Sequence, residues 1–392
     1  MIKKQTPFTP KDVGYRAERL DVLHTHFEKM IERDEIQAAS YCIARDGKVF
    51  AQASLGKFCY RADDTRELQP DSIHKIASVT KLFCAVAIFK LAEDGKLRVA
   101  QKVGEFIEEF SHPPFDEITI AHLLSHTSGM QADPGSFENP YFTSPWNFIQ
   151  HGFENGDDNW VKNSLKSGMR KKPGTEWAYC TFGFVILGEI ISRVSGMFAD
   201  DYIMENIVNP CEMQNTGFAH NISADHASRL ILTGERREEM VRSILAGTAD
   251  ADESEKKWKR IPSTGGGLYS NASDLIKFGT MLLQNGNYNG KYIISRKAVE
   301  RMTTRFTTPD IKDYCWNAGG VERPYALGPD MRNDQNYISS KGTYFHEGAG
   351  ACCLFVDPAE KLVASWFVPF KHDNWYAHGL YNVSSIILSG LE

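Results

Sequence analysis

A serine and a lysine at short spacing form the pattern in this sequence that most clearly could do chemistry. The stretch Ser78-Val79-Thr80-Lys81 stands where a turn-like segment passes into a long apolar run. On a helix, residues three apart share a face, one turn from each other. The free N–H groups at a helix N-terminus also favour negative charge there. A lysine within reach of a serine hydroxyl is one way to build a nucleophile without a Ser-His-Asp triad.

Context selects one serine among several matches to the same spacing. Ser-x-x-Lys begins at Ser54, Ser72, Ser78 and Ser254. Of the other three, one ends a strand-like run, one lies in a charged surface segment, and one is not followed directly by an apolar run of helix length. Only Ser78 opens an apolar run long enough for a buried helix, with Asp94-Gly95 as its end signal. We therefore expect a helix over 78–93 and take Ser78 as the candidate nucleophile.

The composition of the chain indicates what general kind of protein carries the Ser-x-x-Lys motif. The 392 residues are 42% hydrophobic and 24% charged, with a net charge of −6, which is typical of a globular chain with one large or two intimate domains. There is no basic run that would indicate nucleic-acid binding. No apolar stretch reaches the length of a membrane span, and no apolar segment follows the charged N-terminus as in a secretory signal. These features predict a cytoplasmic protein, or a chain trimmed of its leader.

The eight cysteines show no spacing typical of a metal or redox site. In a chain of this length we expect them to be reduced and buried. Cys352 and Cys353 are adjacent, and on a strand their side chains would point to opposite faces.

Hydrophobic periodicity and turn signals predict elements that would hold the motif in place. Helical patterns cover 16–33, 117–129, 182–195, the segment after 265–267 through Leu283, and the end of the chain from about 375; strands are expected at 37–56 as a hairpin around Asp46-Gly47, at 343–356 and at 361–369. The polar, aromatic stretch 131–160 is expected to be a long loop that either covers the core or lines a pocket. The charged stretch 235–259 is expected to be a surface insertion.

Strands near both ends of the chain, with helices between them, indicate a discontinuous arrangement. We expect an α/β domain with an antiparallel sheet from 1–100 and 260–392, and a mainly helical insertion domain from 101–259.

Five segments in a fixed order resemble a known family. They are Ile76-Ala-Ser-Val-Thr-Lys81, Ile118-Thr-Ile-Ala-His-Leu-Leu-Ser-His-Thr-Ser-Gly129, Pro173-Gly-Thr-Glu-Trp-Ala-Tyr-Cys-Thr-Phe-Gly-Phe184, Ser263-Thr-Gly-Gly-Gly-Leu-Tyr-Ser-Asn-Ala-Ser-Asp-Leu275 and Phe345-His-Glu-Gly-Ala349. Over roughly 20–392 the chain resembles the serine β-lactamase and penicillin-binding-protein-like hydrolases, in the class C β-lactamase-type branch that includes family VIII-type carboxylesterases. The resemblance implies an α+β fold, with an antiparallel sheet flanked by helices, a mostly helical domain, and the active site between them.

The resemblance implies a catalytic tyrosine from a Tyr-x-Asn motif, for which the sequence offers two candidates. A literal Tyr-Ser-Asn begins at Tyr269, but the flanking pattern favours Tyr179-Cys180-Thr181. Thr181 then replaces the usual asparagine. Threonine offers one short hydroxyl where asparagine offers a donor and an acceptor, so the departure weakens the β-lactamase interpretation and favours an ester or other acyl substrate.

The third family motif corresponds to His346-Glu347-Gly348, since Lys341-Gly342-Thr343 has the wrong order. Gly348 would let the backbone approach the substrate, and the N–H groups of Ala349 and Ser78 would hold the oxyanion.

Two assignments of the general base remain open. In the first, Lys81 lowers the pKa of Tyr179, with help from a protonated His346, and a phenolate accepts the serine proton. In the second, Lys81 is itself neutral and accepts that proton. The interaction energy of one nearby cation, about 4 kcal/mol, is close to what the phenolate requires.

Other residues give weaker signals. His122 and His126 lack a nearby acid at triad or metal spacing, and we expect them to be structural. The sequence has no His-Glu-x-x-His, no Gly-x-Ser-x-Gly and no phosphate loop. We expect no metal and no cofactor.

The expected function is a serine hydrolase that forms an acyl-enzyme on Ser78, with carboxylic esters favoured as substrates. The catalytic set is Ser78, Lys81, Tyr179 and His346, and Thr181, Gly348 and Ala349 would bind substrate. The alternatives are a β-lactamase, a D-amino-acid-specific peptidase or amidase, and an acyltransferase on the same site. A sensor that is acylated without turnover is the alternative outside the enzymes. The partner is a small ester, amide or lactam; the sequence does not indicate an oligomeric state.

Overall fold

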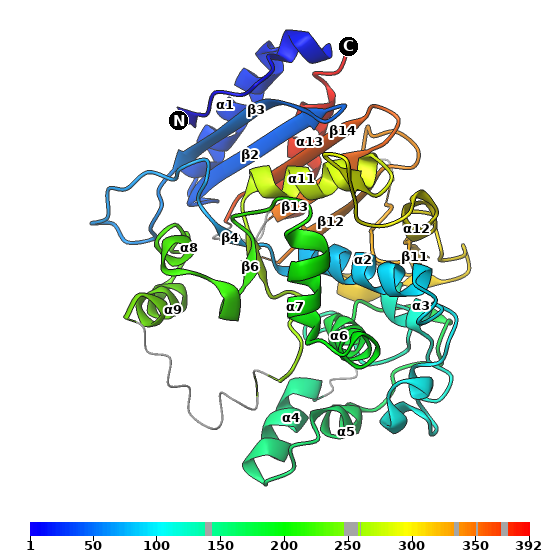
Figure 1. Ribbon diagram of the computed structural model, residues 1–392. Coiled ribbons are helices and arrows are strands. Elements are labelled where there is room, and N and C mark those ends of the chain that lie inside the picture. Colours follow the sequence, from blue (N-terminus) through cyan, green and yellow to red (C-terminus); the bar gives the residue numbers. More distant parts are fainter. Residues whose placement is uncertain (138–142, 247–257, 259, 333–336, 350–351, 370–374) are drawn as a thin grey trace.

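The fold is built on one antiparallel sheet whose strands come from the two ends of the chain. A computed structural model describes residues 1–137, 143–246, 258, 260–332, 337–349, 352–369 and 375–392. The sheet order is β1 (Ile2–Lys3), β3 (Lys48–Gly56), β2 (Ala38–Arg45), β14 (Leu362–Phe367), β13 (Cys352–Asp357) and β12 (Tyr344–Gly348). Each neighbouring pair is antiparallel, so the expected α+β architecture with an antiparallel sheet is confirmed (Figure 1).

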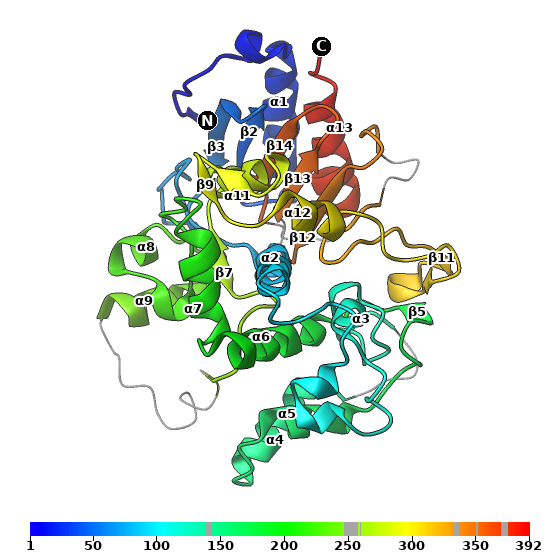
Figure 2. The ribbon, with the colours of Figure 1, turned by 45° about the vertical axis from the view of Figure 1, so that its right-hand side comes forward.

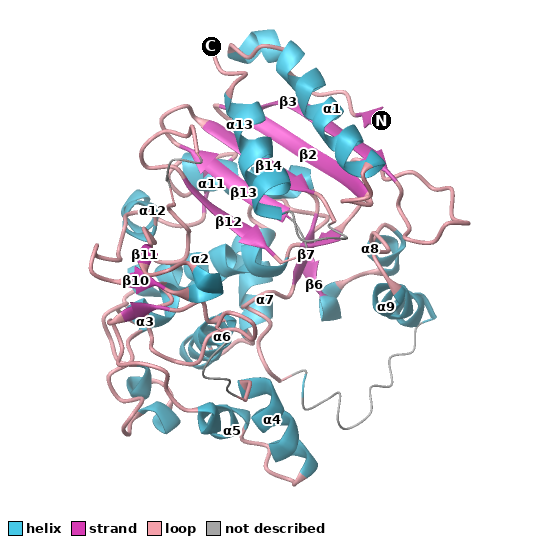
Figure 3. Cartoon of the chain, turned by 180° about the vertical axis from the view of Figure 1, so that it is seen from behind, coloured by secondary structure: helices cyan, strands magenta, loops and turns pink. Residues whose placement is uncertain are grey.

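Alternating side chains on the strands divide the core between the two faces of the sheet. On one face, Tyr41 and Ile43 pack with helices α1 (Glu18–Glu32) and α13 (Asn382–Leu388), which cross the sheet in Figure 3. On the other face, Cys42 and Ala44 pack with α2 (Thr80–Glu93) and α11 (Ala272–Leu283). All eight cysteines are buried and free, and Cys352 and Cys353 belong to opposite faces, as expected.

Helix α2 is the element that carries the Ser-x-x-Lys motif into the centre of the molecule. Its residues 82–89 are all apolar and buried, as expected of a helix that is surrounded by the core. In Figure 2 it is seen almost end-on, with the sheet above it and α6 (Thr181–Ser195) below it. Its contacts with both α6 and α12 (Arg296–Met302) fix it from two sides.

The remaining elements surround this centre. The helices are α3 (Ile120–Leu124), α4 (Pro145–Glu154), α5 (Trp160–Ser164), α7 (Ala199–Ile203), α8 (Ala224–Ser228) and α9 (Glu235–Ala246). Short strands form three small sheets: β4 (His74–Lys75), β7 (Leu268–Ser270) and β6 (Gly217–Phe218); β11 (Val321–Glu322), β10 (Lys312–Asp313) and β5 (Glu176–Trp177); β8 (Asn287–Tyr288) and β9 (Lys291–Tyr292).

Several expected elements are present with shifted bounds. The helices expected at 16–33 and 182–195, and the hairpin at 37–56, correspond to α1, α6 and β2–β3. Asn271 caps α11 by accepting a hydrogen bond from the N–H of Asp274 at 2.9 Å. The helix expected over 117–129 is confined to α3, and His126 has a left-handed φ of 58° just after it.

Two expectations were wrong in part, and a third falls largely outside the described residues. The stretch 131–160 is not one loop, because Pro145 begins α4, whose Ile149 is buried; residues 138–142 lie outside the described part. The stretch 343–356 forms two strands that fold back on each other, with Gly348 opposite Cys352. The charged stretch from 235 begins with helix α9, and most of its remainder (247–257 and 259) lies outside the described residues.

The division into 1–100 with 260–392 and 101–259 stays a prediction. Helix α2, from the first of these ranges, packs on α6 from the inserted range. In the described part of the chain, no single helix is long and apolar enough to cross a bilayer; one pair of helices, α6 with the segment Ala199–Val208, meets the length and composition requirements but bends by 79°.

Candidate active site

Ser78 lies in a single 3₁₀ turn, Ala77–Val79, that leads directly into α2. Ala77 has a φ of 43°, a conformation that residues with a side chain rarely adopt and that often marks a functional site. Strand β7 fixes the turn, because the Ile76 N–H donates to Leu268 O at 3.0 Å and the Leu268 N–H donates to Thr80 Oγ1 at 3.2 Å. The backbone at Ser78 is therefore held in place from outside the helix.

Lys81 is fully buried beside the serine, with its ammonium nitrogen in contact with three oxygen atoms. Nζ lies 3.0 Å from Ser78 Oγ, 3.1 Å from Thr181 Oγ1 and 2.7 Å from Gly265 O. Burial lowers the pKa of Lys81 to about 8, and the negative charge of Asp133 opposes that shift. A substantial fraction of Lys81 is therefore a neutral amine near neutral or mildly alkaline pH.

Asp133 is a site residue that the sequence did not reveal. Its carboxylate accepts hydrogen bonds from Thr181 N at 2.7 Å and from Thr181 Oγ1 at 2.5 Å. Its own N–H donates to Tyr179 O at 2.8 Å, which anchors the segment against the tyrosine. In sequence, Asp133-Pro134-Gly135 reads only as a turn, far from Thr181, so no local pattern identifies it.

These hydrogen bonds order the protons around Lys81. A carboxylate can only accept, so the Thr181 hydroxyl donates its hydrogen bond to Asp133, and its oxygen must accept from Lys81. The Gly265 carbonyl is also an obligatory acceptor. When Lys81 is neutral, both of its N–H groups are used in this way, and its lone pair faces the Ser78 hydroxyl.

Tyr179 lies next to both residues of the motif. Its ring centroid is 5.0 Å from Lys81 Nζ, and its phenol is close enough to Ser78 to interact with the serine hydroxyl. Burial nevertheless raises the pKa of Tyr179 well above its usual value of 10. His126 packs against the tyrosine ring, with the centroids 4.4 Å apart, and accepts the Cys180 N–H through Nδ1 at 3.0 Å.

Tyr269, the other candidate tyrosine, faces a different environment. Its phenol oxygen accepts a hydrogen bond from Arg237 at 2.6 Å, and its residue pairs with Lys75 across β4 and β7. Of the two tyrosines, Tyr179 is therefore the one that the fold brings to Ser78 and Lys81.

His346 and Gly348 lie on β12, at the edge of the sheet that faces α2. His346 Nε2 lies 3.3 Å from the Tyr325 hydroxyl, and Nδ1 lies 2.7 Å from Glu347 O. Burial, reinforced by the positive charge of Lys81, lowers the pKa of His346 to about 3, so its ring is neutral at ordinary pH. Assistance to Tyr179 from a protonated His346 is therefore disfavoured, because burial and the positive charge of Lys81 both oppose a charge on this ring.

Gly348 is the point at which the edge strand meets the nucleophile turn. A Cβ atom at this position would lie 2.3 Å from Ile76 O, so only glycine allows this approach. Ala349 follows directly and is exposed. This close approach brings the end of β12, and Ala349 that follows it, to the turn that carries Ser78.

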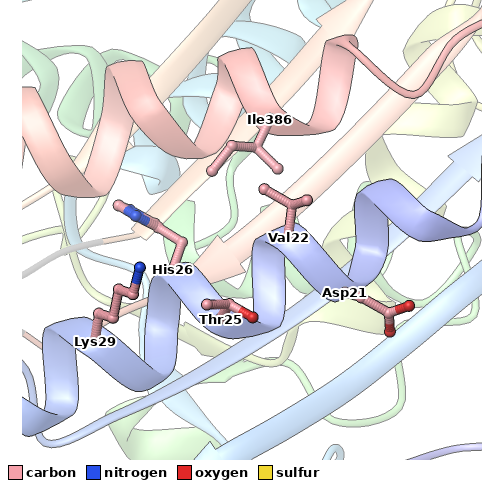
Figure 4. Close-up of a pocket in the computed structure, with 6 residues that line it drawn as sticks. All are labelled: Asp21, Val22, Thr25, His26, Lys29 and Ile386. Atoms are coloured by element: carbon pink, nitrogen blue, oxygen red, sulfur yellow. The ribbon is translucent and has the colours of Figure 1, made fainter.

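A hollow of about 360 Å³ opens beside Lys81, within the size range of ligand pockets. Thr181 and Gly265, the two acceptors of Lys81, line it, and Trp146 and Trp258 form an aromatic wall with their centroids 6.2 Å apart. A separate hollow, between α1 and α13, is lined by residues such as His26 and Ile386 (Figure 4). It lies on the opposite face of the sheet from α2 and has no contact with this site.

Metal ligands do not gather anywhere in the described part of the chain: no group of three His, Cys, Asp or Glu side chains is arranged to hold an ion. His122 takes part in the capping of α3, where its Nδ1 accepts the Thr119 N–H at 3.2 Å.

Comparisons with known proteins show which family and which folds this chain is similar to. The family model described as Beta-lactamase matches residues 23–380. The chain is similar to an N-acetylmuramyl-L-alanine amidase of Bacillus subtilis, at 23% identity over 88% of this chain and 80% of the amidase. It is also similar to a putative D-alanyl-D-alanine carboxypeptidase of Salmonella agona, at 22% identity over 91% of this chain and 84% of that protein.

Among solved structures, the chain is similar to a family VIII carboxylesterase. The TM-score is 0.70 at 19% sequence identity, and the match covers 96% of this chain and 99% of the esterase. At this identity, the likeness concerns the fold.

Proposed function

Since the chain belongs to the β-lactamase family of serine hydrolases, we propose that it hydrolyses carboxylic esters through an acyl-enzyme on Ser78. The observation that carries the choice of ester is the state of Thr181. Its hydroxyl donates a hydrogen bond to Asp133, and its oxygen accepts one from Lys81. No donor remains on this side chain for the carbonyl of a substrate amide, which an asparagine here would bind.

In this proposal, Lys81 is the base that activates the serine. Its lone pair accepts the Ser78 proton as Oγ attacks the ester carbonyl, which forms a tetrahedral intermediate. The N–H groups of Ser78 and Ala349 stabilise the oxyanion, and one such donor is typically worth about 3–4 kcal/mol. Protonated Lys81 then returns its proton through the Tyr179 phenol to the leaving alkoxide. Water attacks the acyl-enzyme by the reverse sequence and releases the acid.

Tyr179 acts here as a neutral proton donor. Burial raises its pKa well above 10, whereas burial lowers the pKa of Lys81 to about 8. At neutral pH the amine is therefore far more available than the phenolate, which favours Lys81 as the proton acceptor. His346 remains neutral and shapes the wall beside Tyr325.

A peptidase or amidase on the same site is the second candidate, favoured by the amidase and carboxypeptidase relatives. A β-lactamase and an acyltransferase use the same acyl-enzyme and differ in substrate or acceptor. The cytoplasmic location expected from the sequence stays a prediction.

The test is a parallel comparison of kcat/KM for p-nitrophenyl esters, a chromogenic β-lactam and D-amino-acid amides. We expect the esters to react fastest. Thr181→Asn should shift the preference towards amides or lactams, because the amide side chain restores a donor. A wild-type enzyme that prefers amides would overturn the ester assignment. One equivalent of product per site without further turnover would instead identify an acylated sensor.

A further inference from the structure

We propose that the substrate carries an anionic group, and that Lys75 and Arg237 bind it in a second hollow, which shares Lys75 with the hollow beside Lys81. This inference rests on the proposed function and adds a class of substrate to it: esters with a carboxylate or phosphate a few bonds from the reacting carbonyl. It depends on the placement of two hollows and on the charges that line them.

Lys75 connects the two hollows. It lines the one beside Lys81, together with Thr181 and Gly265, and it also lines a second of about 600 Å³ with Arg236, Arg237 and Tyr269. Lys75 is paired with Tyr269 across the antiparallel strands β4 and β7. Its backbone at the boundary between the hollows is therefore held by strand hydrogen bonds and does not belong to a loop.

The second hollow is lined mainly by positively charged side chains. Its described lining has three cationic side chains, Lys75, Arg236 and Arg237, against one carboxylate, Glu235. Nearby, Glu238 pairs with Arg61 at 2.8 Å and Arg242 at 3.3 Å, so its charge is already balanced. The chain as a whole has a net charge of −6, which makes this local positive field unusual for the molecule.

Arg237 is oriented by an aromatic partner and not by an acid. Its Nη1 donates to the Tyr269 hydroxyl at 2.6 Å, and its guanidinium lies 4.9 Å from the centre of that ring. Among the described residues, neither Lys75 nor Arg237 has a carboxylate within ion-pair distance. The surrounding protein partly desolvates the Lys75 ammonium, and repulsion by Arg237 and Arg236 adds to this; both lower the pKa of Lys75. An anionic ligand would relieve that repulsion.

The spacing fits a substrate that spans both hollows. Lys75 precedes Ser78 by three residues, so their Cα atoms are at most about 11 Å apart. An ester bound at Ser78 can therefore place an anionic end at Lys75 through a short chain. The aromatic wall of Trp146 and Trp258 would cover the apolar part between the reacting carbonyl and the charge.

The experiment compares matched esters that differ only in charge. One pair has the charge in the acyl group: the p-nitrophenyl half-esters of glutarate and adipate, against the same esters with the free carboxylate methylated. The other pair has it in the alcohol: 4-acetoxybenzoate against its methyl ester. Lys75→Gln and Arg237→Gln are the test variants. Lys29→Gln, on α1 at the opposite face of the sheet, is the matched control.

We expect wild-type kcat/KM to be higher for the charged member of at least one pair. Each test variant should reduce that preference, measured as the ratio of the two kcat/KM values, about tenfold. Added salt should weaken the preference, since partly exposed charges are screened. Lys29→Gln should change nothing.

Equal kcat/KM for charged and neutral esters in both pairs would overturn the anion site while leaving ester hydrolysis intact. A preference that survives both test variants would also overturn it. Failure to hydrolyse any of the four esters would instead overturn the proposed function, so the two failures are distinguishable.

Discussion

At the scale of single residues, the site is defined by how the protons around Lys81 are ordered. Gly265 O and Thr181 Oγ1 accept from Nζ, which leaves one direction of the nitrogen for Ser78. The arrangement needs no histidine base. It explains how a serine in this position can be activated while its neighbouring tyrosine stays protonated.

The rate of acylation should depend on the protonation state of Lys81. If neutral Lys81 is the base, kcat/KM should rise with pH and level off above an apparent pKa of about 8, the value that burial gives this side chain. Stopped-flow acylation with a p-nitrophenyl ester measures this profile between about pH 5 and 10, a range that includes the ordinary pKa of histidine and approaches that of lysine. A rate that declines as Lys81 loses its proton would contradict this role.

Asp133 should influence the reaction through both Lys81 and Thr181. In Asp133→Asn, the negative charge that raises the pKa of Lys81 is lost, so the rising limb of the profile should move to lower pH. The plateau should also fall, by about 10- to 100-fold, because Thr181 is no longer held as an acceptor.

Asp158→Asn is the control for Asp133→Asn, since it removes an exposed carboxylate from the loop before α5. A fall in rate with an unmoved limb would assign Asp133 a purely structural role.

At the scale of elements, the site depends on where the edge strand β12 meets the turn before α2. Gly348→Ala would place a Cβ atom 2.3 Å from Ile76 O and push the strand away from Ser78. We expect kcat to fall about 10²-fold through the displaced oxyanion donor, with some loss of stability. Gly183→Ala is the matched control, because its Cβ would meet Leu123 at 3.4 Å, an ordinary contact.

Kinetics and thermal melts of both glycine variants check this prediction. If Gly348→Ala kept full activity, Ala349 would not supply the donor.

The elements also show what the sequence could and could not provide. The buried helix after Ser78 was predictable, because an unbroken apolar run admits few alternatives. Helix α4 was missed because its Pro, Gly and aromatic residues are also typical of a loop. The burial of Ile149, which stabilises the helix, exists only in the folded chain. Asp133 was missed because its partner Thr181 is distant in sequence, and only the fold joins them. The neutral state of His346 likewise follows from burial, which no motif encodes.

At the scale of the whole molecule, burial of neutral histidines links folding to pH. His74 stacks on Phe367 with the centroids 4.3 Å apart, and burial lowers its pKa to about 3; burial lowers that of His24 to about 4. At pH values between these folded-state pKa values and the ordinary histidine pKa of 6.5, these histidines bind a proton in the unfolded chain but not in the folded one. The free energy of unfolding should therefore fall as pH drops below about 6.5, by up to about 1.4 kcal/mol per pH unit for each group.

Urea titrations at several pH values measure this slope. His74→Gln should make it shallower, since one titrating group is removed, even if the variant is less stable overall. His112→Gln, at an exposed position, should leave the slope as in the wild type. An unchanged slope in His74→Gln would show that this histidine does not titrate on unfolding.

The central claim is that Ser78 becomes covalently acylated, and intact-mass spectrometry of the enzyme quenched during turnover of a p-nitrophenyl ester tests it most directly. We expect one acyl group per chain, located by peptide mapping on the segment that contains Ser78 and absent from Ser78→Ala. An acyl group on Ser72 or another residue, or turnover by Ser78→Ala at the wild-type rate, would contradict it.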